Sequence, residues 1–295
     1  MPAILLNIIT PYYSEMKSKG FGDLPPDFYD EANSKIVVIP VPYDGTSTWI
    51  KGADNGPAKL IEASANMELY DIETDSEVYD KGIFTDRPVT EKKSPESMTE
   101  AVRQRVEGYI KQGKFVVVIG GEHSVSVGAA KAHAGSHNDM AVLQLDAHTD
   151  LREEYHGSKY NHACTMTRIK EFCPIVQAGI RSMDKSETGK SNNIFYAENM
   201  RNDRKWMDKV ISKLPRNVYL TLDLDVFDPS VMPSTGTPEP GGLLWYDILD
   251  LLRKVIEKRN LVGFDVVELC PDHNKHSAFT AAKLIYKIMS YKFKE

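Results

Sequence analysis

The chain has 295 residues, of which 41% are hydrophobic and 26% are charged, and these fractions are typical of a globular protein rather than a disordered one. Lys and Arg number 36 against 42 for Asp and Glu, so the formal net charge is −6, and no long basic run occurs. We therefore expect no binding surface for nucleic acid or for an anionic membrane.

The N-terminus contains an apolar stretch from Ala3 to Ile9, but no basic segment precedes it, and no apolar run approaches the roughly 18 residues of a membrane span. We expect neither a signal peptide nor a transmembrane helix. The three cysteines, Cys164, Cys173 and Cys270, form no CxxC motif and are too few for a disulfide framework. This usage fits a reducing, cytoplasmic compartment, with the thiols packed as small apolar groups.

Residues 1–34 are predicted to form an irregular N-terminal arm, because residues 11–34 mix prolines, glycines and acidic residues without a helical or strand period. From Lys35 onward, the chain alternates between strand and helix patterns. Seven apolar, largely β-branched runs have the pattern of strands covered on both faces: Ile36–Val41, Phe115–Ile119, Ala141–Leu145, Ile175–Ile180, Asn193–Tyr196, Asn217–Leu224 and Leu261–Val267.

Helical patterns lie between these runs, and the clearest are the apolar positions from Ile248 to Ile256 and the Ala-rich stretch from Ser277 to Tyr291. Alternating strands and helices imply right-handed βαβ units and a parallel sheet. The predicted fold class is therefore α/β, as a single three-layer α/β/α domain over residues 35–295 with a mostly parallel sheet of about eight strands.

Polar clusters follow three of the predicted strands, at the carboxyl ends where ligands bind in such sheets. After the first of these strands, two glycines precede His123 in the segment GGEHS, where they allow a sharp turn. A glycine turn with a solvated histidine would show the same pattern. After the next strand, Asp146, His148 and Asp150 alternate along DAHTD, so an extended segment would bring the three side chains to one side.

The third cluster consists of Asp223 and Asp225, which alternate at the end of a mostly apolar strand. A charged loop or a chance DxD would account for any one cluster alone, but the three together supply two imidazoles and four carboxylates. Such ligands suit hard or borderline ions such as Mn²⁺. Six ligands exceed the needs of one tetrahedral ion, and a pair of ions about 3.5–4 Å apart is the arrangement that they favour.

The segments GGEHS, DAHTD and DLDVFDP followed by TGTPEPGG resemble, in order and separation, the three signature segments of the ureohydrolases, the arginase and agmatinase family. The resemblance extends from about Pro40 to the last helix and implies the arginase/deacetylase-like fold. The segment PYDGTS with the following Gly56-Pro57 is more similar to agmatinases than to arginases. The segment Asp272–Ser277 departs from the common form of the family, which leaves the C-terminal rim of the pocket open.

The resemblance implies two Mn²⁺ ions per chain, one held by His123, Asp146, Asp150 and Asp223, and the other by Asp146, His148, Asp223 and Asp225. Asp146 and Asp223 would bridge the ions. His162 falls where the family places its proton-shuttling histidine, Thr237 lies in the TGTP segment of the substrate pocket, and Glu268 falls where the family places the carboxylate that binds the guanidinium. The family also implies a homo-oligomer, a trimer or a hexamer.

The expected chemistry is hydrolysis of a guanidino compound to urea and an amine. A guanidinium is a poor electrophile, so water must first become hydroxide, which a bridging position between two divalent ions favours by lowering the pKa of the water. Asp150 can then mediate protonation of the departing amine, and His162 can replenish the proton because its ordinary pKa is about 6.5. His156 lies in the same loop and competes with His162 for this role.

The expected substrate is agmatine, with putrescine as the product amine and polyamine biosynthesis as the setting. The loop from Leu151 to Tyr155 lacks the Asn and Ser residues with which the arginase pattern binds an amino-acid head group. N1-aminopropylagmatine, arginine, guanidinobutyrate and formiminoglutamate remain alternatives, and Arg152 is a candidate to attract the carboxylate of the last two. Outside this chemistry, a zinc deacylase or a non-catalytic binding protein remains possible. Four further histidines without motif context are expected at the surface: His133, His137, His273 and His276.

Overall fold

The computed structural model describes residues 20–294. The apolar stretch from Ala3 to Ile9 and most of the predicted N-terminal arm lie outside the described residues. The described part of the arm contains two short 3-10 helices, η3 (Phe21–Asp23) and η4 (Pro26–Phe28). Phe21 is buried in the core, and its N–H donates to the hydroxyl of Thr85 at 2.8 Å, which ties this segment to the edge of the sheet.

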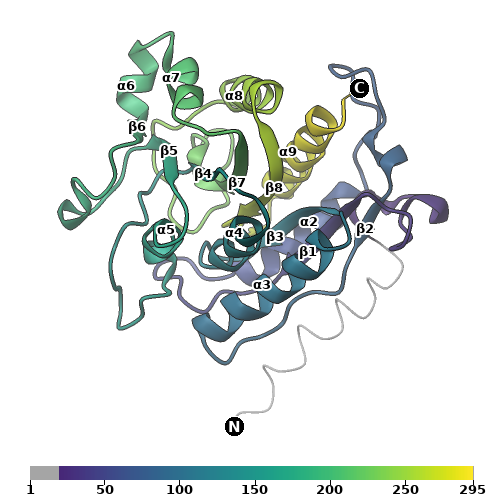
Figure 1. The fold of residues 1–295 in the computed structure, drawn as a ribbon, viewed down its shortest axis with the longest axis horizontal. Coiled ribbons are helices and arrows are strands. Elements are labelled where there is room, and N and C mark those ends of the chain that lie inside the picture. Colours follow the sequence, from purple (N-terminus) through teal and green to yellow (C-terminus); the bar gives the residue numbers. More distant parts are fainter. Residues whose placement is uncertain (1–19, 295) are drawn as a thin grey trace.

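Eight parallel strands form one sheet among the described residues, in the order β2-β1-β3-β8-β7-β4-β5-β6 (Figure 1). This arrangement confirms the predicted α/β class with a parallel sheet. The strands are β1 (Ile36–Val41), β2 (Ile83–Thr85), β3 (Phe115–Gly120), β4 (Met140–Leu145), β5 (Ile175–Ile180), β6 (Ile194–Tyr196), β7 (Asn217–Asp223) and β8 (Asn260–Val267).

The predicted strands differ from the observed ones by one missing strand, β2, and by one residue at five strand ends. Strand β3 ends one residue later, β4 and β8 begin one residue earlier, β6 begins one residue later and β7 ends one residue earlier. The edge strand β2 is absent from the predicted runs, because its three residues are too few to show a periodic pattern. The run predicted from Asn217 to Leu224 ends one residue earlier, since the carboxylate of Asp223 accepts the N–H of Asp225 and starts the 3-10 helix η9 (Leu224–Val226).

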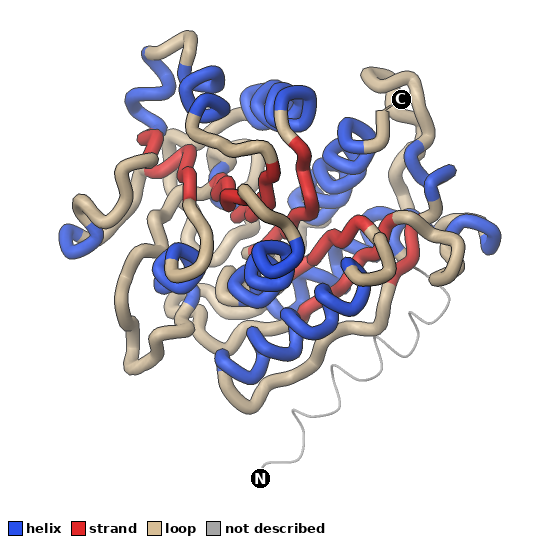
Figure 2. The backbone as a smooth tube through the Cα atoms, viewed as in Figure 1, coloured by secondary structure: helices blue, strands red, loops and turns tan. Residues whose placement is uncertain are grey.

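The helices cover both faces of the sheet, as the tube drawing shows (Figure 2). One apolar cluster packs residues of α2 (Gly56–Ser64), α6 (Ala197–Asn202), α7 (Trp206–Ser212), α8 (Trp245–Lys258) and α9 (His276–Lys292) against the sheet. A second cluster does the same with α3 (Pro95–Ile110), α4 (Val125–Ser136) and α5 (Thr165–Lys170).

The two apolar clusters draw alternate residues from each central strand. In β1, Ile36 and Val38 belong to one cluster, whereas Val37 and Ile39 belong to the other. Successive side chains of a strand point to opposite faces of the sheet, so a strand covered on both sides must be apolar throughout. This is the physical reason why the central strands have continuous apolar sequences.

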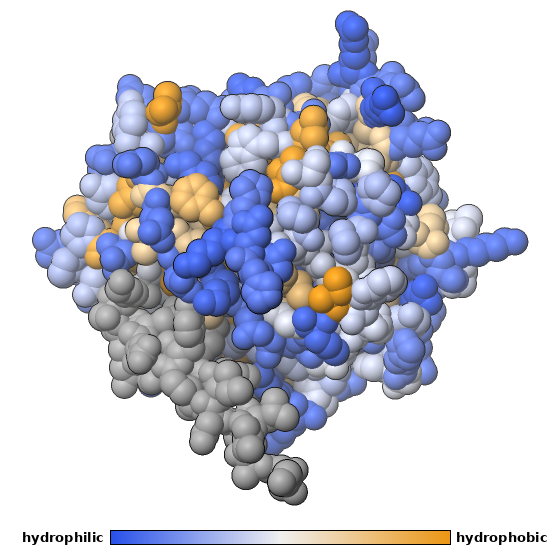
Figure 3. Space-filling view, turned by 180° about the vertical axis from the view of Figure 1, so that it is seen from behind, coloured by the Kyte–Doolittle hydropathy of each residue, from blue (hydrophilic) through white to orange (hydrophobic). Residues whose placement is uncertain are grey.

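The surface has few large apolar side chains, and in the view of Figure 3 they are scattered over a mostly hydrophilic face. Trp49, Ile72 and Tyr246 are among the most exposed of them. Within residues 20–294, no helix combines the length and the apolar character that crossing a membrane requires.

The turn after β3 is held between the ends of two neighbouring strands. The N–H of Gly121 donates to the carbonyl of Val41, the next N–H, of Glu122, donates to the carbonyl of Tyr43, and the N–H of Glu268 donates to the carbonyl of Gly121, each at 2.8 Å. A Cβ atom at Gly121 would overlap the backbone of Tyr43. The glycine therefore allows the close approach that sets the position of the following histidine, His123.

We predict that Gly121→Ala destabilises the protein by at least about 2 kcal/mol, because the new methyl group meets backbone rather than a movable side chain. Thermal unfolding of the metal-free protein measures the effect. Gly108→Ala in α3 is the matched control, since its Cβ would meet nothing within 4 Å, and it should leave stability unchanged or raise it by up to about 1 kcal/mol. Equal melting temperatures for the two variants would contradict this account of the turn.

Candidate metal centre

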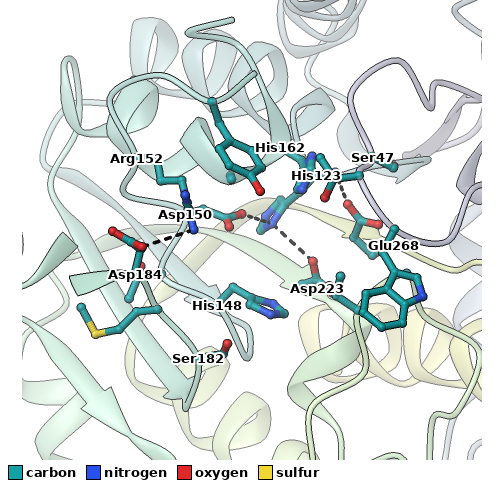
Figure 4. A pocket seen from close by; sticks show the side chains of 18 of the residues that line it. Ser47, His123, His148, Asp150, Arg152, His162, Ser182, Asp184, Asp223 and Glu268 are labelled. Atoms are coloured by element: carbon teal, nitrogen blue, oxygen red, sulfur yellow. Dashed lines mark hydrogen bonds and ion pairs between the residues drawn. The ribbon is translucent and has the colours of Figure 1, made fainter. Parts of the chain in front are cut away.

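Four neighbouring strands, β3, β8, β7 and β4, bring the predicted site residues to the middle of one sheet edge. Although β3 and β4 are consecutive in the chain, two later strands lie between them, and ligands bind in open α/β sheets at such a change of strand order. The side chains meet at the carboxyl ends of these strands (Figure 4). They are His123 after β3, Glu268 after β8, Asp223 and Asp225 at the end of β7, and Asp146, His148 and Asp150 after β4.

The first group of possible metal ligands consists of His123, Asp146 and Asp150, all buried. The Nδ1 atom of His123 lies 2.9 Å from Asp150 Oδ2 and 3.1 Å from Asp146 Oδ2. Despite these short distances, this nitrogen has no hydrogen-bond partner among the described residues. A buried, unpartnered nitrogen facing two carboxylate oxygens fits the coordination of a cation at this place.

The second group consists of Asp146, His148 and Asp225. The Nδ1 atom of His148 lies 2.9 Å from Asp225 Oδ2 and 3.7 Å from Asp146 Oδ1. Asp146 thus turns one carboxylate oxygen toward each group, as a bridging ligand would. The structure therefore brings together two potential metal sites that share one carboxylate.

Asp223 lies beside the first group, with its Oδ2 atom 3.4 Å from His123 Nδ1. Its other oxygen accepts the N–H of Asp225 at 2.9 Å. The expected role of Asp223 as a second bridging ligand stays a prediction.

Burial and the charge of a neighbouring carboxylate act together on Asp150 and on Asp223. Burial, and then the charge of Asp146, raise the pKa of Asp150 to about 6. Burial and the charge of Asp225 hold the pKa of Asp223 well above its usual value. Although burial opposes the change, Asp225 and Asp146 raise the pKa of His148 to about 12. Without a metal, protons thus occupy the cluster, and a divalent cation would replace them.

A second layer of polar groups orients His123, and none of the sequence motifs includes these groups. The Nε2 atom of His123 lies 2.9 Å from the hydroxyl of Thr221, which donates to the buried Asp265 at 2.7 Å. Ser126 and Tyr219 also donate to this carboxylate, at 2.9 and 2.6 Å. The one sequence feature that indicates this layer is Asp265, a charged residue inside the otherwise apolar run of β8.

A cavity of about 310 Å³ opens beside the two groups, and His123, His148, Asp150, His162, Asp223, Thr237 and Glu268 are among its lining residues. Glu268 accepts the N–H of His123 on its Oε1 atom at 2.8 Å. Its Oε2 atom lies toward Gly236, another residue of the cavity wall. Both Glu268 and Asp150 adopt positive φ, 66° and 50°, a backbone conformation that costs non-glycine residues energy and that is found preferentially at functional sites.

The two competing histidines of the loop after β4 occupy different places. His162 begins the 3-10 helix η7 (His162–Cys164) and lines the cavity, whereas His156 is exposed and is not a lining residue. Burial lowers the pKa of His162 to about 4, so its imidazole is neutral at physiological pH, and the expectation that it keeps its ordinary pKa of about 6.5 does not hold. The geometry thus favours His162 over His156 for contact with a bound molecule.

Arg152 is already engaged at the other end of the pocket from Glu268 (Figure 4). Its guanidinium lies 3.8 Å from a carboxylate oxygen of Asp184 and stacks over the ring of Tyr155, 4.3 Å from the ring centroid. A substrate carboxylate would have to compete with Asp184 for this charge. The arrangement therefore does not favour a negatively charged substrate.

His133 has no predicted role and is expected at the surface, but the structure buries it. It is 1% exposed, packs against the ring of Tyr219, and occupies space that a Cβ at Gly263 would fill. The three cysteines are buried and unpaired, as predicted. Burial raises the pKa of each thiol to about 11, which keeps it protonated and unreactive.

A family model described as the arginase family matches residues 34–290. An N(1)-aminopropylagmatine ureohydrolase of Synechocystis sp. is 38% identical over 274 residues, covering 88% of this chain and 90% of the relative. An agmatinase of Pyrococcus horikoshii is 30% identical and covers 88% and 93%. The solved structure of an agmatine ureohydrolase of Thermoplasma volcanium is 29% identical and superimposes with a TM-score of 0.85 over 97% of this chain and 98% of that one.

We predict that stabilisation by Mn²⁺ increases as the pH rises from 5 to 7.5. Asp150 has a pKa raised by folding, so in the metal-free protein its contribution to stability is present below about pH 4 and is lost as the pH rises through about 6. Over the same range, fewer protons compete with the metal. Mn²⁺ at about 100 times its dissociation constant should add about 2.7 kcal/mol to the free energy of unfolding. This increase should raise the melting temperature by roughly 5 °C.

Thermal unfolding with EDTA or with added Mn²⁺ measures this effect. Asp223→Ala, which removes a carboxylate beside His123 Nδ1, should reduce the stabilisation at pH 7.5. A shift of equal size at both pH values would show that the ion binds elsewhere.

Proposed function

The chain belongs to the arginase family and is a hydrolase of guanidino compounds, and on this premise we propose that it converts N1-aminopropylagmatine to urea and the corresponding polyamine. The observation that supports this proposal most directly is the pair of potential metal-ligand groups that share Asp146 beside a cavity that Glu268 lines. The named activity of the 38% identical relative supports the aminopropylated substrate.

We propose that Mn²⁺ is the metal, with two ions per chain, held by the six residues expected from the sequence: His123, Asp146, His148, Asp150, Asp223 and Asp225. When bound, such a pair of divalent ions supplies a hydroxide nucleophile at neutral pH. The donor set fits because it combines carboxylates and imidazoles without a thiolate.

The residues of the chain perform binding and proton transfer in this proposal. Glu268 accepts N–H bonds from the substrate guanidinium with the carboxylate oxygen that its contact to His123 leaves free, and Thr237 borders the same space. Asp150, which lines the cavity, relays a proton through its carboxylate to the departing amine. His162, which lines the cavity, restores that proton from solvent.

Agmatine is the second candidate substrate, and it was the first expectation from the sequence. The agmatinase of Pyrococcus horikoshii and the agmatine ureohydrolase of Thermoplasma volcanium are similar over most of the chain and favour it. The two candidates share the guanidinium end and differ only in the aminopropyl extension of the amine. The residues at the metal end of the cavity therefore serve either substrate.

We further propose that residues 35–295 form one catalytic domain preceded by an arm over residues 1–34. The single sheet and the family match over residues 34–290 support this division. Assembly into a trimer or hexamer and a cytoplasmic location stay predictions from the sequence, and light scattering on the purified protein tests the first.

We predict that the Mn²⁺-loaded enzyme releases urea from N1-aminopropylagmatine with the highest kcat/KM of a five-compound panel. The other compounds are agmatine, arginine and guanidinobutyrate, which are also assayed by urea release, and formiminoglutamate, whose hydrolysis is assayed by release of formamide. The three compounds with a carboxylate should be at least about 100-fold poorer, a loss of about 2.7 kcal/mol, because the pocket presents carboxylates and its Arg152 is paired with Asp184. Arginine as the best substrate, or no urea from any compound, would refute the proposal.

Glu268→Gln tests whether this carboxylate binds the substrate guanidinium. This variant keeps an acceptor for the N–H of His123 but loses the negative charge, so it should retain its metal and lose at least about tenfold in kcat/KM on every active substrate. Activity within about twofold of the parent enzyme would show that the guanidinium binds elsewhere.

A further inference from the structure

Thr46 connects two loops that lie far apart in the sequence and close together beside the cavity. Its hydroxyl oxygen accepts the backbone N–H of His162 at 2.9 Å and lies 3.3 Å from the Nδ1 atom of the same residue. Its carbonyl accepts an amide N–H of Asn161 at 3.4 Å. The loop after β1 thus holds both the backbone and the imidazole of a cavity residue that follows 116 positions later.

The hydroxyl of Thr46 donates in turn to a buried carboxylate. Its donor bond reaches Glu122 Oε1 at 3.0 Å, and the same carboxylate accepts the N–H and the hydroxyl of Ser124, at 3.0 and 2.8 Å. Glu122 is fully buried and belongs to neither group of possible metal ligands. The three donors that it accepts from, together with its place outside both ligand groups, indicate that this carboxylate orients its neighbours.

The number of available hydrogens determines which ring nitrogen of His162 is protonated. A hydroxyl has one hydrogen, and the Oε1 atom of Glu122 already accepts two hydroxyl hydrogens, from Thr46 and Ser124, so it has none to give to Thr46. Since Thr46 gives its hydrogen to Glu122, its oxygen presents only lone pairs to His162. The nitrogen that faces this oxygen, Nδ1, must therefore carry the hydrogen of the neutral imidazole, and the lone pair remains on Nε2.

We propose that Thr46, with its hydroxyl directed by Glu122, is a positioning residue that holds His162 in the Nδ1–H tautomer and so makes Nε2 the atom that exchanges protons in the cavity. The catalytic part of this inference rests on the proposed function, whereas the tautomer rests on the contacts alone. Protonation of Nε2 leaves the Nδ1–H bond to Thr46 in place. The imidazole can therefore gain and lose a proton without reorienting.

The tautomer is measured by NMR on the full chain labelled with ¹⁵N-histidine and loaded with diamagnetic Zn²⁺ in place of paramagnetic Mn²⁺. The His162 signals are assigned by their loss in His162→Ala. In the parent and in Thr46→Ser, which keeps the hydroxyl, Nδ1 should bear the proton. In Thr46→Val, which keeps the shape and removes the hydroxyl, population of the Nε2–H tautomer should appear. A proton on Nε2 in the parent, or no change in Thr46→Val, would overturn the inference.

Kinetics of the Mn²⁺-loaded enzymes test the consequence for catalysis. Thr46→Val should lower kcat at least about tenfold and change KM by less than about twofold, because a shuttle acts on proton transfer and not on guanidinium binding. Thr46→Ser should restore most of kcat. A rise in KM at unchanged kcat, or an equal loss in Thr46→Ser, would overturn the positioning role. If the parent releases no urea from any compound while the tautomer changes as expected, the proposed function fails and the tautomer assignment stands.

Discussion

The mutual repulsion of carboxylates at the ends of the adjacent strands β4 and β7 is the constraint on which the rest of the site depends. Asp146, Asp150, Asp223 and Asp225 are all buried, and each unpaired charge in such surroundings costs several kcal/mol. The sheet can hold them together only with compensating positive charge, as protons or as metal ions. The burial and the repulsion that raise the pKa values of Asp150 and Asp223 therefore also favour divalent cations.

Two histidines of the site are oriented by the same kind of device. The hydroxyl of Thr221 lies between His123 and the buried Asp265, and the hydroxyl of Thr46 lies between His162 and the buried Glu122. In each case a threonine donates to a carboxylate and turns its lone pairs toward an imidazole. A ring that binds a metal through Nδ1 needs its hydrogen on Nε2, whereas a ring that exchanges protons through Nε2 needs it on Nδ1. The two arrangements supply opposite tautomers from the same components.

The sequence indicates the parallel sheet and the polar clusters because both depend on local patterns. A strand covered on both faces, such as β1, must be apolar throughout, and alternating residues such as Asp146 and His148 share one side of an extended segment. The three-residue strand β2 shows no such pattern and was missed. The partnership of Thr46 with His162 depends on the packing of two distant loops, and no spacing in the sequence reveals it.

The proposal that this sheet edge holds two ions sharing Asp146 can be tested by anomalous diffraction at the manganese absorption edge from Mn²⁺-loaded crystals. We expect two peaks per chain, about 3.5–4 Å apart, one beside His123 and Asp150 and the other beside His148 and Asp225, with Asp146 between them. A single peak, or peaks away from these residues, would contradict it.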